Sequence, residues 1–436
     1  MKILFTGSGT GGHFYPLIAV AEEINRIAEE EHLVSPKLYF MGPTPYDNAA
    51  LAENGITFTK VSAGKVRRYA SLLNITDMIK TAQGVLKAIW AVFLLFPDVV
   101  FSKGGYTSVP VVFASRFFGI PVVVHESDSK PGRANAWAAK FAKRIAISYP
   151  SAATYFPAEK TALTGNPVRK AIREPQRTGA REYLKLEEKT PVIFVMGGSQ
   201  GAKRINETVL DSLTELVKDY EIIHQTGVAH IDDIEKTSHV ILKDNPHAHR
   251  YHPFAYLNDL AMKMSAGAAD IIVSRAGSTI FEIAQWGLPS IILPLSQDVS
   301  HDQFHNAITY AKSGACLVIE DHNLSPHVLI ADIRRILENE TERNAMKEAA
   351  LSFTKNDAAT VIAKELLAIA LKHEGGSEEG TMQKETEEST AQPLTAGESG
   401  EAVQTNVSHE DSPILGQHSG MSKKDETERP FSIGPH

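Results

Sequence analysis

The chain has 436 residues, more than the about 300 residues that one hydrophobic core usually serves, so we expect two domains. Its 43% hydrophobic and 22% charged residues are typical of a soluble globular protein, and its single cysteine, Cys316, excludes a disulfide framework and favours a reducing compartment. The net charge of −8 lies at the C-terminal end, because residues 374–436 hold 13 acidic and 4 basic residues, whereas residues 1–373 hold 39 and 40. This balance argues against nucleic-acid binding, and the short apolar run after Lys2 argues against a signal peptide.

Short β-branched runs alternate with amphipathic stretches along most of the chain. The predicted strands are residues 2–6, 37–41, 98–102, 121–125 and 144–148, followed by 191–196, 221–225, 271–275 and 290–294. Strands that alternate with helices predict parallel sheets covered on both faces, so the fold class is α/β with two Rossmann-like domains. Ligands of such sheets bind at the carboxyl ends of the strands, which places the expected site in the cleft between the domains.

Four segments follow from this pattern. Residues 1–165 and 166–352 are predicted to form the N-terminal and C-terminal domains, and residues 353–373 a last helix. Residues 374–436 are rich in Glu, Ser, Thr and Gly and poor in aromatic residues, so they bury too little apolar surface to offset the entropy of ordering. We therefore expect a disordered, solvated acidic tail.

A glycine-rich turn, F-T-G-S-G-T-G-G-H, follows the first predicted strand. Gly7, Gly9 and Gly12 have the G-x-G-x-x-G spacing of dinucleotide-binding turns. A nicotinamide site also requires an acidic residue after the second strand, where this chain has Gly42 and Pro43. The pattern therefore predicts a tight turn that another ligand approaches closely.

The second predicted domain has a similar glycine-rich turn, G-G-S-Q-G-A at residues 197–202, before a predicted helix. Backbone N–H groups at such a helix start attract anions, and Ser199 adds a hydroxyl donor, so we expect a diphosphate here unless the turn is merely tight.

A third strand, loop and helix unit carries Arg275 and Glu282. With a helix starting near Ser278, Glu282 lies in its first turn, where it either stabilises the helix dipole or binds vicinal hydroxyls. Gln303 and Asn306 are three residues apart, hence on one helical face, and their amides suit sugar hydroxyls.

Taken together, seven motifs in order over residues 1–370 resemble the MurG family of peptidoglycan N-acetylglucosaminyltransferases. They are G-T-G-G-H-x-x-P at Gly9, G-G-Y-x-S at Gly104, H-E at His125, T-G-N-P-V-R at Thr164, G-G-S-Q-G-A at Gly197, S-R-A-G at Ser274 and Q-x-x-N-A at Gln303. The resemblance implies a GT-B architecture and an inverting transfer from UDP-N-acetylglucosamine (UDP-GlcNAc) to the muramyl C4 hydroxyl of lipid I, which gives lipid II. It implies no required metal or other cofactor.

The resemblance also assigns site residues. On the acceptor side it implies Thr10, Gly11, Gly12, Tyr106 and Asn135, with His13 and Glu126 as catalytic candidates. For UDP-GlcNAc it implies Thr10, Gly11, Gly12, Asn135, Arg169, Ser199, Leu257, Arg275, Glu282, Gln303 and Asn306. Arg169 and Ser199 would face the phosphates, Glu282 the ribose, and the segment around Leu257 the uracil.

His13 is the first candidate for the general base, because the attacking hydroxyl loses a proton and an imidazole titrates near neutral pH. An electrostatic role toward the acceptor diphosphate is the alternative for His13, and Glu126 is the second candidate for the base. His125 is expected to orient the strand end. One departure from the family pattern stands out: H-E-Q-N is replaced by H-E-S-D, which puts a carboxylate at Asp128.

The segment of residues 75–96 is an amphipathic candidate for membrane contact. It carries Ile79, Leu86, Trp90, Phe93 and Leu94, is flanked by Lys80 and Lys87, and follows Lys65, Arg67 and Arg68. Its uncharged run, residues 88–96, is too short to span a bilayer but suits an anionic membrane surface, with core packing as the alternative. We therefore expect a peripheral protein at the cytoplasmic face of the cell membrane, with other cell-wall synthesis proteins as possible partners.

Other functions share this architecture. A transferase of another lipid or small acceptor, a non-hydrolysing UDP-sugar epimerase and a silent sugar-nucleotide binder all remain open on the fold alone. The presence of His13, Arg169 and Glu282 together disfavours the silent binder.

Overall fold

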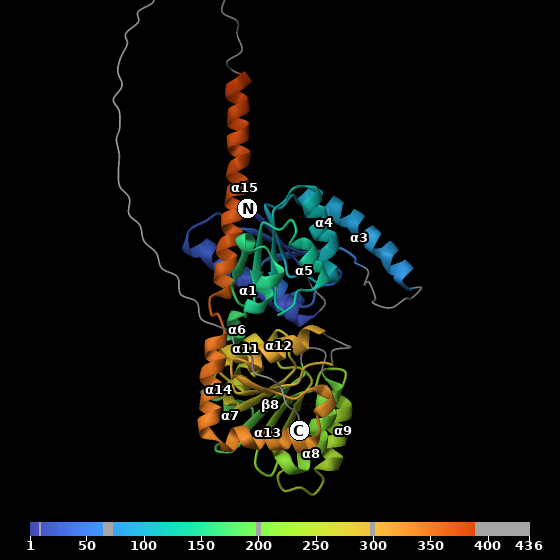
Figure 1. The fold of residues 1–436 in the computed structure, drawn as a ribbon, viewed down its shortest axis with the longest axis vertical. Coiled ribbons are helices and arrows are strands. Elements are labelled where there is room, and N and C mark those ends of the chain that lie inside the picture. The colour runs from blue at the N-terminus through green and yellow to red at the C-terminus, as the bar shows by residue number, and fades with distance from the viewer. Residues whose placement is uncertain (8–9, 64–72, 198–201, 297–300, 389–436) are drawn as a thin grey trace, which may run out of the picture. The chain divides into compact units, whose positions relative to one another are not determined.

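Two parallel sheets organise the chain, as the sequence predicts (Figure 1). The computed structural model describes residues 1–7, 10–63, 73–197, 202–296 and 301–388. Within them the first sheet has the strand order β3-β2-β1-β4-β5-β6-β7 and the second β10-β9-β8-β11-β12-β13. The pairing is parallel; Phe5 of β1, for example, lies opposite Phe40 of β2 and Phe101 of β4. The predicted fold class, two Rossmann-like domains in series, is confirmed.

The nine predicted strands are all present. In the first sheet the strands are β1 (Lys2–Thr6), β2 (Lys37–Gly42), β3 (Ile56–Lys60), β4 (Val99–Ser102), β5 (Val122–Glu126), β6 (Arg144–Ile147) and β7 (Thr161–Leu163). In the second they are β8 (Val192–Met196), β9 (Glu221–Gln225), β10 (Tyr251–Phe254), β11 (Ile271–Ser274), β12 (Ser290–Ile292) and β13 (Cys316–Val318). The four strands that the sequence did not predict, β3, β7, β10 and β13, are the four sheet edges.

Helices connect and cover these strands. The first domain contains α1 (Gly11–Glu30), α2 (Asn48–Glu53), α3 (Leu73–Leu95), α4 (Val109–Phe117) and α5 (Arg133–Ala138). The second contains α6 (Lys170–Arg173), α7 (Ala180–Tyr183), α8 (Lys203–Leu216), α9 (Ile231–Ile241), α10 (Asp259–Ala268), α11 (Thr279–Trp286), α12 (His301–Ala311), α13 (Pro326–Glu338) and α14 (Glu340–Phe353). Short 3-10 helices are η1 (Tyr106–Ser108), η2 (Pro150–Tyr155), η3 (Ala158–Lys160), η4 (Ala248–Arg250) and η5 (Asp321–Asn323).

The central strands are buried on both faces. In β1, Ile3 and Phe5 pack in one hydrophobic cluster together with α1, whereas Leu4 packs in the cluster on the opposite face. In β8, Phe194 packs on one side and Ile193 on the other. Strands that are covered on both faces read as continuous apolar runs, which is why the sequence identifies them.

The strand order in each sheet places its switch point at the first strand of the domain. β1 lies between β2 and β4, and β8 lies between β9 and β11. Crossovers leave in opposite directions at such a point, so the carboxyl ends of β1 and β4, and of β8 and β11, border a crevice. The two predicted glycine-rich turns follow β1 and β8, at these ends.

The last helix, α15 (Ala358–Glu388), returns to the first domain. Ile362, Leu366 and Ala370 are buried in the cluster that contains β1 and α1, and Glu365 pairs with Arg144 at 3.0 Å. The helix continues beyond His373, where the sequence analysis ended it, because Glu, Gln, Lys and Met in residues 378–388 are good helix formers. The remainder of the predicted disordered tail, residues 389–436, lies outside the described residues.

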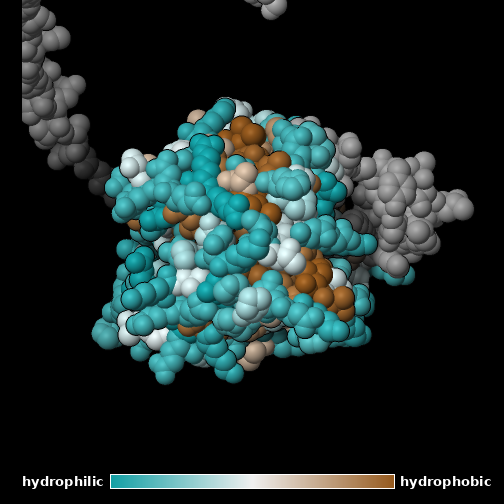
Figure 2. Space-filling view, turned by 90° about the horizontal axis from the view of Figure 1, so that it is seen from below, coloured by the Kyte–Doolittle hydropathy of each residue, from teal (hydrophilic) through white to brown (hydrophobic). Residues whose placement is uncertain are grey.

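Polar side chains dominate the face of the second domain that is seen from below (Figure 2). Helices α8 and α13 lie at that end of the domain in Figure 1. Both are amphipathic: Ile205, Val209 and Leu213 of α8, and Leu329 and Ile333 of α13, pack together in the core. Their polar sides therefore face solvent.

Candidate functional site

A cavity of about 650 Å³ lies at the carboxyl ends of the strands, with walls from both domains. The first domain contributes residues of the turn after β1 and of the loop after β5, and the second contributes the ends of β8 and β11 and parts of α11 and α12. The lining residues that bear on the argument are Thr10, Gly12, His13, Asp128, Arg275, Ser278 and Gln303. The predicted acceptor turn thus shares one cavity with predicted donor residues.

A second, tighter cavity of about 80 Å³ adjoins the first. Gly12, Ser278 and Thr279 line both of them. Arg169, Leu257 and Glu282, which the sequence analysis assigns to the nucleotide, line the second cavity. The predicted phosphate, uracil and ribose contacts are therefore brought together.

The turn after β1 has the conformation that its glycines allow. Gly7 has a φ of +116°, and a Cβ there would lie 3.0 Å from the Gly104 carbonyl oxygen. A Cβ on Gly12 would lie 2.6 Å from Ser278 Oγ, at the start of α11 in the other domain. Thr10 has extended dihedrals and its carbonyl accepts from the His13 N–H, so α1 begins at Gly11. Helix α1 thus begins at the cavity, which Thr10, Gly12 and His13 line.

His13 is half-buried in the wall of the larger cavity. Burial, and to a smaller extent the charge of Lys103, lower the pKa of His13 to about 4. The imidazole is therefore neutral near pH 7 and can accept a proton, although a bound anion is needed to make it a stronger base.

Glu126, the second candidate for the base, ends β5 and is only 2% exposed. Its two carboxylate oxygens accept from the Asp128 N–H at 2.9 Å, the Gly132 N–H at 3.1 Å and Asn135 Nδ2 at 2.9 Å. Burial and the neighbouring Asp128 raise the pKa of Glu126 to about 7. Glu126 does not line either cavity, so this position favours His13 as the base and gives Glu126 the task of ordering the loop after β5.

Asn135 and Tyr106 also lie outside the lining of both cavities. Asn135 is buried on α5, where its Nδ2 also donates to the His125 carbonyl and its amide packs where a Cβ of Gly104 would be. Tyr106 is 41% exposed at the start of η1. Asn135 thus supports the loop, and Tyr106 stands at the surface near it in sequence.

On the donor side, Arg169 lies between the two domains. Its Nη1 donates to Asp259 at 2.7 Å, and its guanidinium carbon lies 3.6 Å from the ring centroid of Tyr15 on α1. The Tyr15 hydroxyl is 3.1 Å from that of Tyr256 in the second domain. Arg169 Nε is buried without a hydrogen-bond partner, and Arg169 lines the smaller cavity.

Glu282 and Leu257 both line the second cavity but differ in burial. Glu282 is half-buried in the first turn of α11, as predicted, and burial raises its pKa. The Leu257 side chain is only 2% exposed in the core, and its N–H donates to Gln225 Oε1 at 3.3 Å. Leu257 is thus buried at the wall of the second cavity, with its N–H bonded within the protein.

Arg275 follows β11 and is 9% exposed. Its Nη1 donates to the Leu293 and Pro294 carbonyls and to Asp321 at 3.1 Å, and its Nε is buried without a partner. Burial lowers the pKa of Arg275, but a guanidinium stays charged. A cation is thus fixed at the wall of the larger cavity.

The predicted pair Gln303 and Asn306 lies on α12, but only Gln303 lines the cavity. Asn306 is fully buried: its Oδ1 accepts from the Ser129 N–H at 2.8 Å, and its Nδ2 donates to Asp128 Oδ1 at 2.8 Å and to the Ala276 carbonyl at 3.2 Å. Both amide hydrogens are used within the protein, and the bonds to Ser129 and Asp128 join the two domains; the sugar contact of Asn306 stays a prediction. Ser199 lies outside the described residues.

Sequence analysis missed Lys103, which follows β4 and is 1% exposed. Its Nζ lies 2.7 Å from His125 Nδ1 and 3.1 Å from Asn166 Oδ1. The signal that identifies it is a lysine placed directly between a strand buried on both faces and a pair of glycines.

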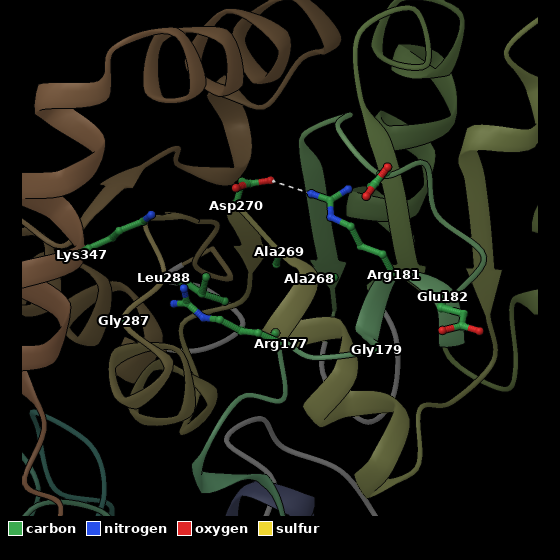
Figure 3. Close-up of a pocket in the computed structure, with 12 residues that line it drawn as sticks. Arg177, Gly179, Arg181, Glu182, Ala268, Ala269, Asp270, Gly287, Leu288 and Lys347 are labelled. Atoms are coloured by element: carbon green, nitrogen blue, oxygen red, sulfur yellow. Dashed lines mark ion pairs between the residues drawn. The ribbon is translucent and has the colours of Figure 1, made fainter.

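A separate cavity of about 490 Å³ in the second domain contains none of the predicted residues (Figure 3). Arg177, Arg181 and Lys347 line it, but so do Glu182, Glu188 and Asp270, and Arg181 pairs with Asp270 at 3.8 Å. The charges balance, so this cavity gives no preference for a charged ligand. Within the described residues, no group of three or more His, Cys, Asp or Glu side chains is arranged to hold a metal ion.

Helix α3 presents large apolar side chains to solvent. Ala88 and Val92 are buried in the core, whereas Leu86, Trp90, Phe93 and Leu94 are 54–68% exposed. On α4, Phe113 and Phe117 are 43% and 67% exposed. Core packing, the alternative for this segment, therefore holds for one side of the helix, and the other side leaves apolar side chains exposed. The side chains of Ile79 and Lys80, and the residues Lys65, Arg67 and Arg68, lie outside the described part. No helix in the described part of the chain is long and apolar enough to cross a bilayer.

Sequence comparison places both domains among known proteins. The glycosyltransferase family 28 N-terminal domain matches residues 3–147, and the family 28 C-terminal domain matches residues 192–365. A Treponema denticola protein named "UDP-N-acetylglucosamine--N-acetylmuramyl-(pentapeptide) pyrophosphoryl-undecaprenol N-acetylglucosamine transferase" is 35% identical, over 83% of this chain and 96% of that protein. A Clostridium kluyveri protein of the same name is 33% identical, over 83% of this chain and 99% of its own length.

Solved structures give the same architecture. Acinetobacter baumannii MurG is 24% identical with a TM-score of 0.61, covering 84% of this chain and 99% of that one. A Neisseria meningitidis UDP-GlcNAc 2-epimerase bound to UDP-GlcNAc also has a TM-score of 0.61, at 16% identity, covering 84% of this chain and all of that one (100%). At these identities the likeness concerns the fold, which transferases and epimerases share.

Proposed function

Because the chain belongs to glycosyltransferase family 28, we propose that it is the MurG-type transferase of peptidoglycan synthesis. It moves N-acetylglucosamine from UDP-GlcNAc to the C4 hydroxyl of the muramyl residue of lipid I, which gives lipid II. The relatives that carry this activity in their names match over more than four fifths of this chain.

The single observation that carries the proposal is the shared cavity. His13 and the first turn of α1 line it from the first domain, and Arg275, Ser278 and Gln303 line it from the second. A transferase must hold two substrates face to face, whereas an epimerase acts on one.

The chemistry follows from the two walls. The acceptor oxygen attacks the sugar C1 from the face opposite the diphosphate, the bond from C1 to the phosphate oxygen breaks, and the proton of the hydroxyl passes to the neutral His13 imidazole. The departing UDP gains negative charge, which the fixed guanidinium groups of Arg169 and Arg275 and the start of α11 stabilise. Glu282 accepts from the ribose hydroxyls.

Two guanidinium groups at the wall supply positive charge at the place where a metal ion would otherwise be needed. We therefore propose that transfer requires no metal. The test is transfer in EDTA against transfer in Mg²⁺: equal rates support the proposal, and a rate that falls on chelation and returns with Mg²⁺ contradicts it.

The exposed side chains of α3 and α4 form the surface that faces the membrane in this proposal. Trp90, Phe93 and Phe117 would enter the interfacial region, and Lys87 and Arg116 would meet anionic headgroups. The protein is then peripheral, at the cytoplasmic face where UDP-GlcNAc is available, and contacts with other cell-wall synthesis proteins belong to the same proposal.

The test is acceptor-dependent release of UDP from UDP-GlcNAc. Release with a short-chain lipid I analogue, with the disaccharide product identified by mass, is the expected result. A diacylglycerol acceptor and a reaction without acceptor are the controls. Release with diacylglycerol alone would point to another lipid acceptor, UDP-N-acetylmannosamine formed without acceptor would point to an epimerase, and UDP binding without turnover would point to a silent binder.

A further inference from the structure

Lys103 is a buried cation at the switch point of the first sheet. It follows β4, beside the turn on the acceptor side. If Gly7 had a Cβ, that atom would lie 3.0 Å from the Lys103 Cβ. An ammonium group is costly to remove from water unless charged or polar groups compensate it. Its nearest polar atoms are therefore informative about its role.

The contacts of Lys103 define the hydrogen positions on His125. His125 Nε2 lies 3.0 Å from the Gly165 carbonyl oxygen, which only accepts, so Nε2 carries a hydrogen. Ser148 Oγ, at 3.3 Å from the same nitrogen, can also accept. His125 Nδ1 then has the lone pair that receives the Lys103 ammonium at 2.7 Å. With a Lys103 N–H directed at Nδ1 and Nε2–H directed at the Gly165 carbonyl, the ring is neutral, in the Nε2–H tautomer.

Two acids after and at the end of β5, Asp128 and Glu126, compensate the cation. Glu126 and Asp128 both raise the pKa of Lys103, although burial is the larger influence and lowers it to about 7. Burial raises the pKa of Asp128, and the charge of Lys103 opposes that rise. Lys103 thus faces His125 and Glu126 from β5, Asp128 from the following loop and, at longer range, His13 from α1.

Asp128 connects this group of charges to the cavity and to the second domain. Its Oδ1 accepts from Asn306 in the second domain, and Asp128 lines the larger cavity beside His13. An ionised Asp128 without a nearby cation would either take up a proton or move toward water. Either change would weaken the loop that joins the two walls.

We propose that Lys103 is a positioning residue of the transfer reaction, which holds His125 as the Nε2–H tautomer and balances Glu126 and Asp128 so that their loop stays against Asn306. Of the two experiments that test this inference, only the kinetic one rests on the proposed function.

The kinetic arm compares Lys103→Met, Asp128→Asn and the double variant with wild type. Lys103→Met keeps the length of the side chain and removes its charge, so we expect kcat to fall about 100-fold, the cost of a small misplacement of reacting groups. The KM for UDP-GlcNAc should stay within about threefold, because Lys103 itself lines neither cavity. Asp128→Asn keeps the oxygen that Asn306 contacts and removes the unbalanced charge. The kcat of the double variant should therefore be about tenfold higher than that of Lys103→Met. Lys189→Met, at an exposed lysine, is the matched control.

The second arm needs no substrate. In the full chain labelled with ¹⁵N in histidine, with signals assigned through His125→Gln, wild-type His125 should show the Nε2–H tautomer from pH 8 to pH 5. In Lys103→Met, or in the double variant if the single one does not fold, His125 should bind a proton at higher pH. A different tautomer of His125 in wild type overturns the proposal. A kcat of Lys103→Met within about threefold of wild type also overturns it, as does a double variant whose kcat is no higher than that of Lys103→Met. Wild type that shows the tautomer but no transfer would instead contradict the proposed function.

Discussion

The two walls of the cavity handle charge in different ways. In the first domain, His125, Lys103 and Glu126 are buried and His13 is half-buried, and burial shifts the pKa of each so that its neutral form is favoured. In the second domain, Arg169 pairs with Asp259 and Arg275 pairs with Asp321, and these two guanidinium groups stay charged. The first wall therefore controls where protons reside, and the second supplies fixed positive charge. A displacement that moves a proton at one substrate and leaves charge on the other needs both.

The largest expected effect is on the first wall. His13→Ala removes the group that receives the acceptor proton, so kcat should fall about 10²- to 10⁴-fold. The KM for UDP-GlcNAc should change little, because His13 does not line the smaller cavity, where Arg169, Leu257 and Glu282 lie. Steady-state kinetics with the lipid I analogue measure both constants.

His239→Ala, at an exposed position of α9, is the matched control and should match wild type. An equal fall in both histidine variants, or a full-rate His13→Ala enzyme, would show that the first wall does not handle the proton.

A buried histidine away from the cavity sharpens the comparison. His224 is fully buried between Tyr251 and Asn206, and burial lowers the pKa of His224 to about 3. The unfolded chain binds a proton near the ordinary pKa of about 6.5, so the stability from neutral His224 is present above that pH and is lost as pH falls toward 3. The loss by pH 4 is about 3 kcal/mol in the free energy of unfolding.

Urea unfolding of wild type and His224→Gln between pH 7 and pH 4 measures this loss, and the variant should show the smaller pH dependence. Its kcat at pH 7.5 should be that of wild type, in contrast to His13→Ala. Identical pH dependence in the two proteins would mean that His224 does not resist protonation.

The second wall is tested by Arg169→Met. A hydrogen bond to a charged group contributes about 1.5–3 kcal/mol, so kcat/KM for UDP-GlcNAc should fall about 10- to 100-fold, mostly through KM. Arg177→Met, at an exposed arginine of the separate cavity, is the control. A variant that lost kcat with an unchanged KM would place Arg169 in the transition state only, and the division between the walls would have to be redrawn.

The sequence predicted the inner strands of both sheets because burial on both faces leaves continuous apolar runs. It missed the edge strands since ITFTK alternates with polar residues, YHPF contains proline, and TAL and CLV are too short to be distinctive. The positions of His13, Arg275 and Glu282 beside the cavities also agree with the sequence, because each follows a strand end. The roles of Lys103 and Asn306 depend on partners 22 and 178 residues away in the chain, and no local pattern contains those partners.

The smallest expected effect concerns a surface that belongs to the first domain alone. Trp90 and Phe93 are 64% and 54% exposed, and their rings lie 6.1 Å apart on α3. Burying one such side chain in an apolar phase contributes about 1.5–3 kcal/mol, and an interface buries it in part, so Trp90→Ser and Phe93→Ser should each weaken binding to vesicles with anionic lipid by about tenfold. Val240→Ser, at a residue 73% exposed on α9, should bind as wild type does. Flotation with vesicles measures the partition. If all three variants bound equally, the apolar side of α3 would not face the membrane, and the division of labour between the domains would be confined to the cavity.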